Sequence, residues 1–258
     1  MFIDILQNTA YQLIYTIGLI AVFGFAVGLL NKAIYKLVGY KFGRVVCIAT
    51  GFIGVPIHEI GHALFCLLFG HKITEIKLYQ PNSADGTLGY VNHKYNPKNL
   101  YHQIGNFFIG FGPILFGCTV ILLLMFWLVP DMFTAFRNNT EFFKTLTVFY
   151  SFSELNNWRW WVFIVSACSI ALHMSLSTAD IKGSLVGFGF IAITLLIINT
   201  ALYFVKIEAM GILTNYSLTA GVFALNFLTI SVVFSLILLL FGVVICLQRN
   251  RKNGVSNK

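Results

Sequence analysis

The sequence predicts an all-α polytopic membrane protein with about six transmembrane helices and a short β-hairpin between the second and the third. Hydrophobic residues make up 58% of the 258 positions and charged residues only 10%, far below the roughly 25% typical of soluble domains. Apolar stretches long enough to cross a bilayer as a helix, about 20 residues each, recur along the whole chain. The composition therefore argues against a water-soluble fold.

Stretches almost free of charge are expected to form the spans, because a charged side chain in the bilayer core is costly. They are residues 9–30, 45–70, 104–130, 158–179, 184–205 and 218–247. No repeat or Pro/Gly/Ser-rich linker separates them, so residues 1–258 are expected to form a single membrane-embedded domain. The first span lacks the basic region of a cleavable signal peptide, and we expect it to remain in the mature protein.

The net charge of +8 comes from Lys and Arg residues that lie mainly between the apolar stretches. Bases in that position set membrane topology, so the expected partner is the lipid bilayer and not nucleic acid. The basic tail at 249–258 favours a cytoplasmic C-terminus, although the bases at 32–44 weigh against it. We expect a multi-pass protein of the cell membrane whose C-terminus and segment 71–103 are cytoplasmic.

Within 71–103, two β-prone runs, "KITEIKLY" and "TLGYV", flank "QPNSADG". Pro, Asn and Asp-Gly are turn formers, so this pattern predicts a β-hairpin. An irregular polar loop is the alternative, and it fits the same residues about as well.

The strongest chemical signal is an HExxH motif, "GVPIHEIGHALF", within the second span. Residues four apart share one helix face, so His58 and His62 can bind one zinc ion while Glu59 lies beside its open coordination position. Zinc lowers the pKa of a bound water to about 7, and Glu59 would take that water's proton and deliver it to the leaving amine. The motif therefore predicts peptide hydrolysis, with a polar packing network as the alternative.

A catalytic zinc usually has a third protein ligand. Leu68 stands where the extended HExxHxxGxxH pattern needs a histidine, which excludes that soluble type. Asp180, in "ALHMSLSTADIKGS" at the end of the otherwise uncharged fourth span, is the preferred candidate. An interfacial ion pair with Lys182 is its alternative role. Other possible ligands lie just beyond the second span: His71, Glu75 and His93.

His173 stands seven residues before Asp180, two helical turns away, and shares its face if the helix continues that far. It is expected to line the same cavity, either as a zinc ligand or as a hydrogen-bonding contact to the substrate or oxyanion. The alternative is a histidine packed against a backbone carbonyl.

An intramembrane HExxH, a β-prone segment, a further span and a later span ending in aspartate resemble the site-2 protease family of intramembrane zinc metalloproteases. The resemblance covers residues 45 to about 187, the expected catalytic core, and no PDZ or nucleotide-binding module is expected. It implies that Asp180 matches the aspartate of the family's NxxPxxxLDG motif, although Ala179 and Ile181 replace the leucine and glycine. It also implies that the hairpin, residues 72–92, pairs its edge with an unwound substrate.

The sequence thus predicts an intramembrane endopeptidase with one Zn²⁺ per chain, held by His58, His62 and Asp180, acting on a membrane-spanning protein or peptide. Two rivals belong to other classes. A membrane metal-ion transporter or sensor would use the same side chains as a transit site, but spans five and six offer few polar residues, mainly Asn199, Thr200 and Asn226. A proteolytically inactive binder of membrane helices would tolerate loss of Glu59.

Overall fold

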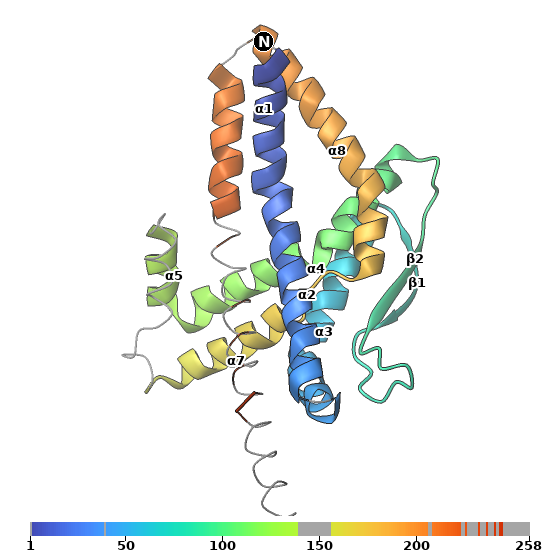
Figure 1. The fold of residues 1–258 in the computed structure, drawn as a ribbon, viewed down its shortest axis with the longest axis vertical. Coiled ribbons are helices and arrows are strands. Elements are labelled where there is room, and N and C mark those ends of the chain that lie inside the picture. The colour runs from blue at the N-terminus through green and yellow to red at the C-terminus, as the bar shows by residue number, and fades with distance from the viewer. Residues whose placement is uncertain are drawn as a thin grey trace, which may run out of the picture.

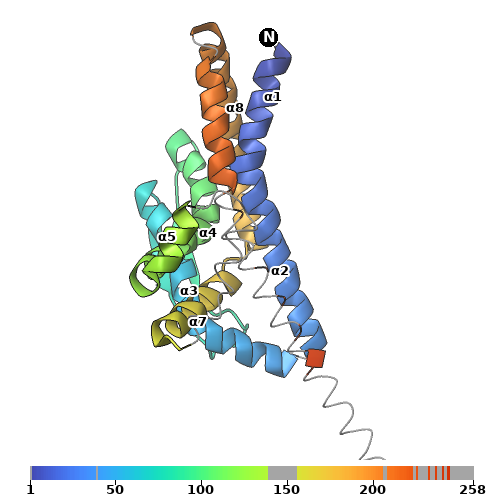
Figure 2. The ribbon, with the colours of Figure 1, turned by 90° about the vertical axis from the view of Figure 1, so that its left-hand side faces the viewer.

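The computed structural model describes residues 2–38, 40–138, 156–205 and 208–222, with a few single positions between 225 and 244. Most of them are helical (Figure 1). At the N-terminus, α1 (Phe2–Leu13), the π-helical turn η1 (Ile14–Gly18) and α2 (Leu19–Val38) follow one another as a single long rod (Figure 2). α3 (Tyr40–Leu68) then turns back and carries the HExxH motif.

Four helical stretches among the described residues are long and apolar enough to cross a membrane. They are Phe2–Leu30, Gly43–Leu68, Leu100–Leu128 and Thr178–Val205. Large apolar side chains remain exposed along them, as expected where lipid covers a helix surface. The chain is therefore a mainly helical membrane protein, as predicted.

Six spans are not confirmed. The fourth predicted span, 158–179, is helical only over α7 (Trp158–Leu172), 15 residues, or about 22 Å at 1.5 Å per residue, which is short of the roughly 30 Å hydrocarbon core. The fifth is α8, which begins earlier than predicted and covers Thr178–Val205. Most of the sixth, 218–247, and the C-terminus lie outside the described residues.

The break between α7 and α8 has a local cause in the sequence S-x-x-D. The Ser177 hydroxyl accepts a hydrogen bond from the Asp180 amide at 3.1 Å, and the Asp180 carboxylate accepts one from the Ser177 amide at 2.8 Å. This reciprocal pair is a capping box, which starts a helix. Asp180 therefore lies in the first turn of α8, and its prediction at the end of the fourth span was wrong.

The predicted hairpin is present. β1 (Lys72–Lys77) pairs antiparallel with β2 (Tyr90–Lys94), with Ile73 opposite His93 and a bulge before Glu75. β2 begins within "TLGYV" and extends two residues past the predicted end at 92. The hairpin lies beside α3 and α4 (Figure 1).

α3 packs closely against α4 (Leu100–Leu128), where two glycines meet. A Cβ on Gly61 would lie 2.8 Å from the carbonyl oxygen of Gly112, and a Cβ on Gly112 would lie 2.7 Å from that of Gly61. Only glycine permits this approach, which is a common device between membrane helices. It brings the HExxH turn of α3 against α4, which stays helical through Pro113.

Two further contacts complete the framework. α5 (Pro130–Asn138) and α7 pack with α4 around buried apolar side chains that include Ile121, Met125 and Phe163. At the other end of the molecule, α1 packs against α8 and also against the helical residues 208–222 (Figure 1). The start of α8 is left facing the middle of α3.

Candidate metal centre

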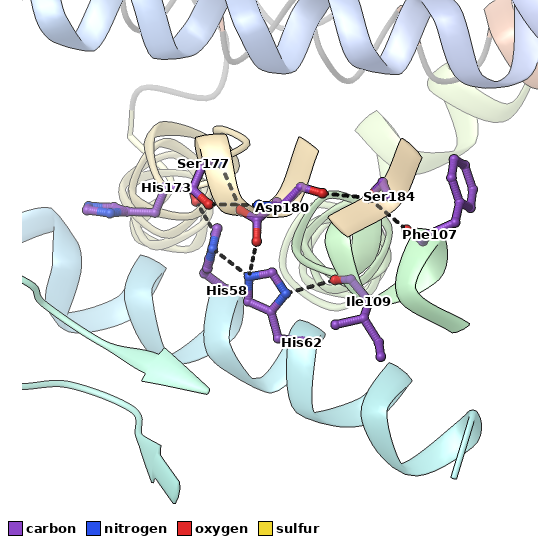
Figure 3. Close-up of polar contacts among 8 residues, drawn as sticks. All are labelled: His58, His62, Phe107, Ile109, His173, Ser177, Asp180 and Ser184. Atoms are coloured by element: carbon purple, nitrogen blue, oxygen red, sulfur yellow. Dashed lines mark hydrogen bonds and ion pairs between the residues drawn. The ribbon is translucent and has the colours of Figure 1, made fainter. Parts of the chain in front are cut away.

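His58 and His62 lie on one face of α3 and point toward the start of α8 (Figure 3). Their ring centroids are 4.8 Å apart, and the two Nε2 atoms are 3.2 Å apart. The i, i+4 spacing of the motif therefore places the two imidazoles side by side, as the helix period predicts.

Both rings are held by backbone carbonyls. His58 Nδ1 lies 2.6 Å from the carbonyl oxygen of His173, and His62 Nδ1 lies 2.8 Å from that of Ile109. A carbonyl oxygen only accepts, so each Nδ1 must carry the hydrogen. In the neutral rings both Nε2 atoms then present lone pairs to each other, an arrangement that a cation between or beside them would satisfy. Histidines that bind metals are typically held in this way.

Asp180 completes the group. Its Oδ1 lies 3.5 Å from His62 Nε2, and the ligand atoms of His58, His62 and Asp180 all lie within 4.8 Å of one another. Its other oxygen remains in the capping box with Ser177. Among the described residues it forms no ion pair with Lys182, the alternative partner.

These three residues, His58, His62 and Asp180, can therefore hold a metal ion and are called the metal group below. Two imidazole nitrogens and one carboxylate oxygen suit Zn²⁺, which in catalytic sites is held by three protein ligands and leaves a fourth position open. His62 and Asp180 keep 12% and 14% of their side-chain surface exposed, so the group is partly open and not sealed in the core.

Glu59 stands between two cavities that meet at this group. The larger, about 580 Å³, is bounded by α2, α3, α7 and the start of α8, and the smaller, about 350 Å³, by α3, β2, α4 and α8. His58, Glu59, Gly89 and Ser177 line both. The Glu59 residue is only 6% exposed, but it lines both cavities.

The hairpin touches this carboxylate just before β2. A Cβ on Gly89 would lie 2.9 Å from Glu59 Cγ and 3.0 Å from Glu59 Oε1. Glycine therefore lets the backbone of the hairpin run directly past Glu59. The β-prone segment therefore reaches the candidate site.

The ring of His173 is not in the metal group. His173 caps the C-terminus of α7, and its Nε2 lies 3.1 Å from Thr50 Oγ1, facing the larger cavity. It does not share a helix face with Asp180, because the helix ends before it. Its carbonyl, which holds His58, is the part that serves the centre, and a backbone group leaves no signal in a residue pattern.

The other candidate ligands are placed apart from the group. Glu75 accepts a hydrogen bond from the Tyr90 hydroxyl at 2.5 Å. His71 is paired with His93, with the two Nδ1 atoms 3.0 Å apart. Sequence reasoning missed two contributors, Ser177 and Ile109. The S-x-x-D pattern could have revealed Ser177, whereas the carbonyl of Ile109 has no sequence signature.

Comparison with known proteins gives no match to any family model, curated protein or solved structure. What the site can do is therefore derived from its own atoms. It combines a group able to hold a metal ion, an adjacent carboxylate outside that group, and two cavities that reach both. Those are the parts that metal-assisted hydrolysis requires.

Proposed function

We propose that this protein is an intramembrane zinc endopeptidase that hydrolyses peptide bonds of membrane-spanning proteins or peptides. One Zn²⁺ per chain would be held by His58, His62 and Asp180. The observation that carries the proposal is the pair of histidines whose Nδ1 hydrogens are taken by carbonyls, so that both Nε2 lone pairs converge beside Asp180. Such a site is preorganised for a cation, and a second carboxylate lies next to it.

Glu59 is the proposed general base. Zinc, when bound, would supply a Lewis acid that polarises a carbonyl and makes water acidic near neutral pH. Glu59 directly follows His58 on α3, lines both cavities and forms no hydrogen bond or ion pair with another described side chain. Its carboxylate is thus available to accept a proton from water and return it to the leaving amine.

Location in the membrane makes water access part of the proposal. Hydrolysis consumes water, which the hydrocarbon core does not supply. The smaller cavity is lined by polar and ionisable side chains that include His93 and Asn106. It is the proposed route for water, and its wall of β2 is where a substrate strand would pair, as the resemblance to site-2 proteases suggests.

The transporter alternative has less support. It needs further polar side chains free along a path through the helices. Asn199, one of the main candidates, is fully buried and hydrogen-bonded to Thr9 and Gln12. That residue is occupied in packing α8 against α1.

The test is the zinc content of the detergent-purified full-length protein by mass spectrometry. We expect about one zinc per chain in the wild type and loss or strong weakening in His58→Ala, His62→Ala and Asp180→Ala. His102→Ala is the matched control, since its ring contacts the amide of Asn96 and not the metal group. Absence of zinc from the wild type after metal loading, or retention in all three variants, would refute the zinc site.

A further inference from the structure

A line of hydrogen bonds runs from the start of α4 to the hairpin, outside the metal group. His71 Nε2 lies 3.0 Å from the carbonyl oxygen of His102, and His71 Nδ1 lies 3.0 Å from His93 Nδ1. His71 is 3% exposed, and its ring stacks on Tyr95 with centroids 4.9 Å apart. A histidine held on both ring nitrogens and on its face is fixed in orientation.

The direction of these hydrogen bonds follows from the carbonyl at one end. Because the His102 carbonyl can only accept, His71 Nε2 carries a hydrogen and, in the neutral ring, His71 Nδ1 carries a lone pair. His93 Nδ1 must then donate to His71 Nδ1. In the neutral His93 ring, Nε2 is consequently left as an acceptor, and it has no hydrogen-bond partner among the described residues.

His93 lies on the wall of the smaller cavity. Gly89, just before β2, and Tyr90, Val91 and His93 within it all line the cavity. His62, Glu59 and Asp180 line the same cavity. The free acceptor is therefore presented to any molecule that occupies the space beside the proposed zinc ligands.

We propose that His93 is a substrate-binding residue whose Nε2 accepts a hydrogen bond from a backbone N–H of the peptide in the smaller cavity, with His71 as its positioning residue. This rests on the proposed function and specifies which form of the substrate is recognised. In a helix the peptide N–H groups are already bonded within the chain, so only an unwound, extended segment offers one. An acceptor at this point thus favours an extended peptide over an intact helix.

The protonation preference of the ring agrees with an accepting role. Burial lowers the pKa of His93 from its ordinary value, and the neighbouring His71 and His62 lower it further. At neutral pH the ring is therefore kept uncharged, with its Nε2 lone pair available. A buried peptide N–H without a partner would carry a desolvation cost, which the acceptor removes.

The experiment compares two probes on the zinc-loaded, detergent-purified full chain. Acetohydroxamate contacts a zinc ion alone, whereas a leucine dipeptide hydroxamate adds peptide N–H groups. We expect His93→Leu to weaken the dipeptide probe about 3- to 10-fold, the loss of one hydrogen bond, without changing acetohydroxamate affinity. His93→Gln, whose amide oxygen can accept, should restore most of the difference.

A double-mutant comparison tests the positioning role. If His71 acts through His93, the variant with both His71→Leu and His93→Leu should bind the dipeptide probe no more weakly than His93→Leu alone. Unchanged dipeptide affinity in His93→Leu, or equal loss of both probes, would overturn this inference while leaving the zinc site standing. No zinc-dependent acetohydroxamate binding by the wild type would instead overturn the proposed function, and this inference with it.

Discussion

α8 carries a polar group near each end, Asn199 in one and Asp180 in the other, and the two groups differ in how their hydrogen bonds are satisfied. At Asn199, the side-chain amide donates to Thr9 at 2.8 Å and to Gln12 at 2.9 Å, and its oxygen accepts from Gln12 at 3.2 Å. At Asp180, the neighbouring His58 and His62 instead turn two lone pairs toward each other at 3.2 Å. The side chains around Asn199 satisfy one another's hydrogen bonds, whereas the two histidines beside Asp180 leave a pair of lone pairs facing each other.

The difference separates structural from functional polarity inside membrane helices. Both groups would be costly in lipid if left alone. The Asn199 network removes that cost with its own donors and acceptors, and so ties α1, α8 and the helical residues 208–222 together. In the metal group a bound cation would remove it, and His58, His62 and Asp180 are placed where they could hold one.

The largest effect is expected from Glu59→Gln. Glutamine keeps the size of the side chain but cannot accept the proton, so cleavage should fall by about 10²- to 10⁴-fold. Zinc content should stay at the wild-type level, because Glu59 is outside the metal-binding group. Peptide products from a set of membrane peptides, measured by mass spectrometry, provide the readout, and undiminished turnover would rule out the proposed base.

Ser177→Ala should weaken the metal group without removing a ligand. Losing the hydroxyl that caps the Asp180 amide costs about 1 kcal/mol of helix stability and loosens the first turn of α8, which carries Asp180, so zinc affinity should drop roughly 10-fold. Competition with a zinc-binding dye measures this. Thr178→Ala is the control, and an equal loss in both variants would contradict the role of the cap.

Asn199→Leu should destabilise the fold while sparing the metal group. It leaves the amide oxygen of Gln12 without its donor, at a cost of about 1–3 kcal/mol, while Gln12 Nε2 keeps its hydrogen bond to Thr214. The variant with both Gln12→Leu and Asn199→Leu should be less destabilised than the sum of its single changes. Thermal unfolding in detergent, read together with zinc content, tests this. Loss of zinc in a folded Asn199→Leu protein would show that the two groups are not independent.

The smallest effect is a pH dependence of stability from His71. Burial and the nearby His102 lower its pKa below the ordinary 6.5, although the hydrogen bond to the His102 carbonyl opposes this. Below about pH 6.5 the unfolded chain therefore binds more protons than the folded one, and the stability present above that pH is lost on acidification. His71→Gln should show a smaller drop in melting temperature between pH 7.5 and 5.5, and an equal drop would exclude His71 as the source.

Much of the fold and of the candidate site could be predicted from the sequence, because these parts follow from the helix period and the amino-acid composition. The HExxH spacing on a helix placed His58 and His62 together, and the β-prone runs around "QPNSADG" gave the hairpin. The predicted boundaries of the fourth and fifth spans were wrong, because hydropathy alone did not register the end of α7 at Leu172 or the S-x-x-D cap that begins α8. Asp180 does lie beside the two histidines, but it belongs to the first turn of α8 and not to the end of the fourth predicted span.

The contributions that could not be predicted are made by the backbone. Carbonyls of Ile109 and His173 fix the two imidazoles, and glycines at 61 and 112 set the approach of α3 to α4. Any residue except proline carries the same N–H and C=O groups, so a motif cannot record which of them is used. The sequence predicted that the His173 ring would serve the site, but it is the backbone carbonyl of His173 that contacts His58.

Asp180 has a consequence for the order of biosynthesis, because the residue that starts α8 also completes the donor set. His58 and His62 enter the membrane early, on α3, whereas Asp180 follows only after α4 and α7. A metal ion can meet its full set of ligands only when α8 has inserted and docked. Competence to bind the ion would thus be acquired at assembly, and a truncated or misassembled chain would stay inert.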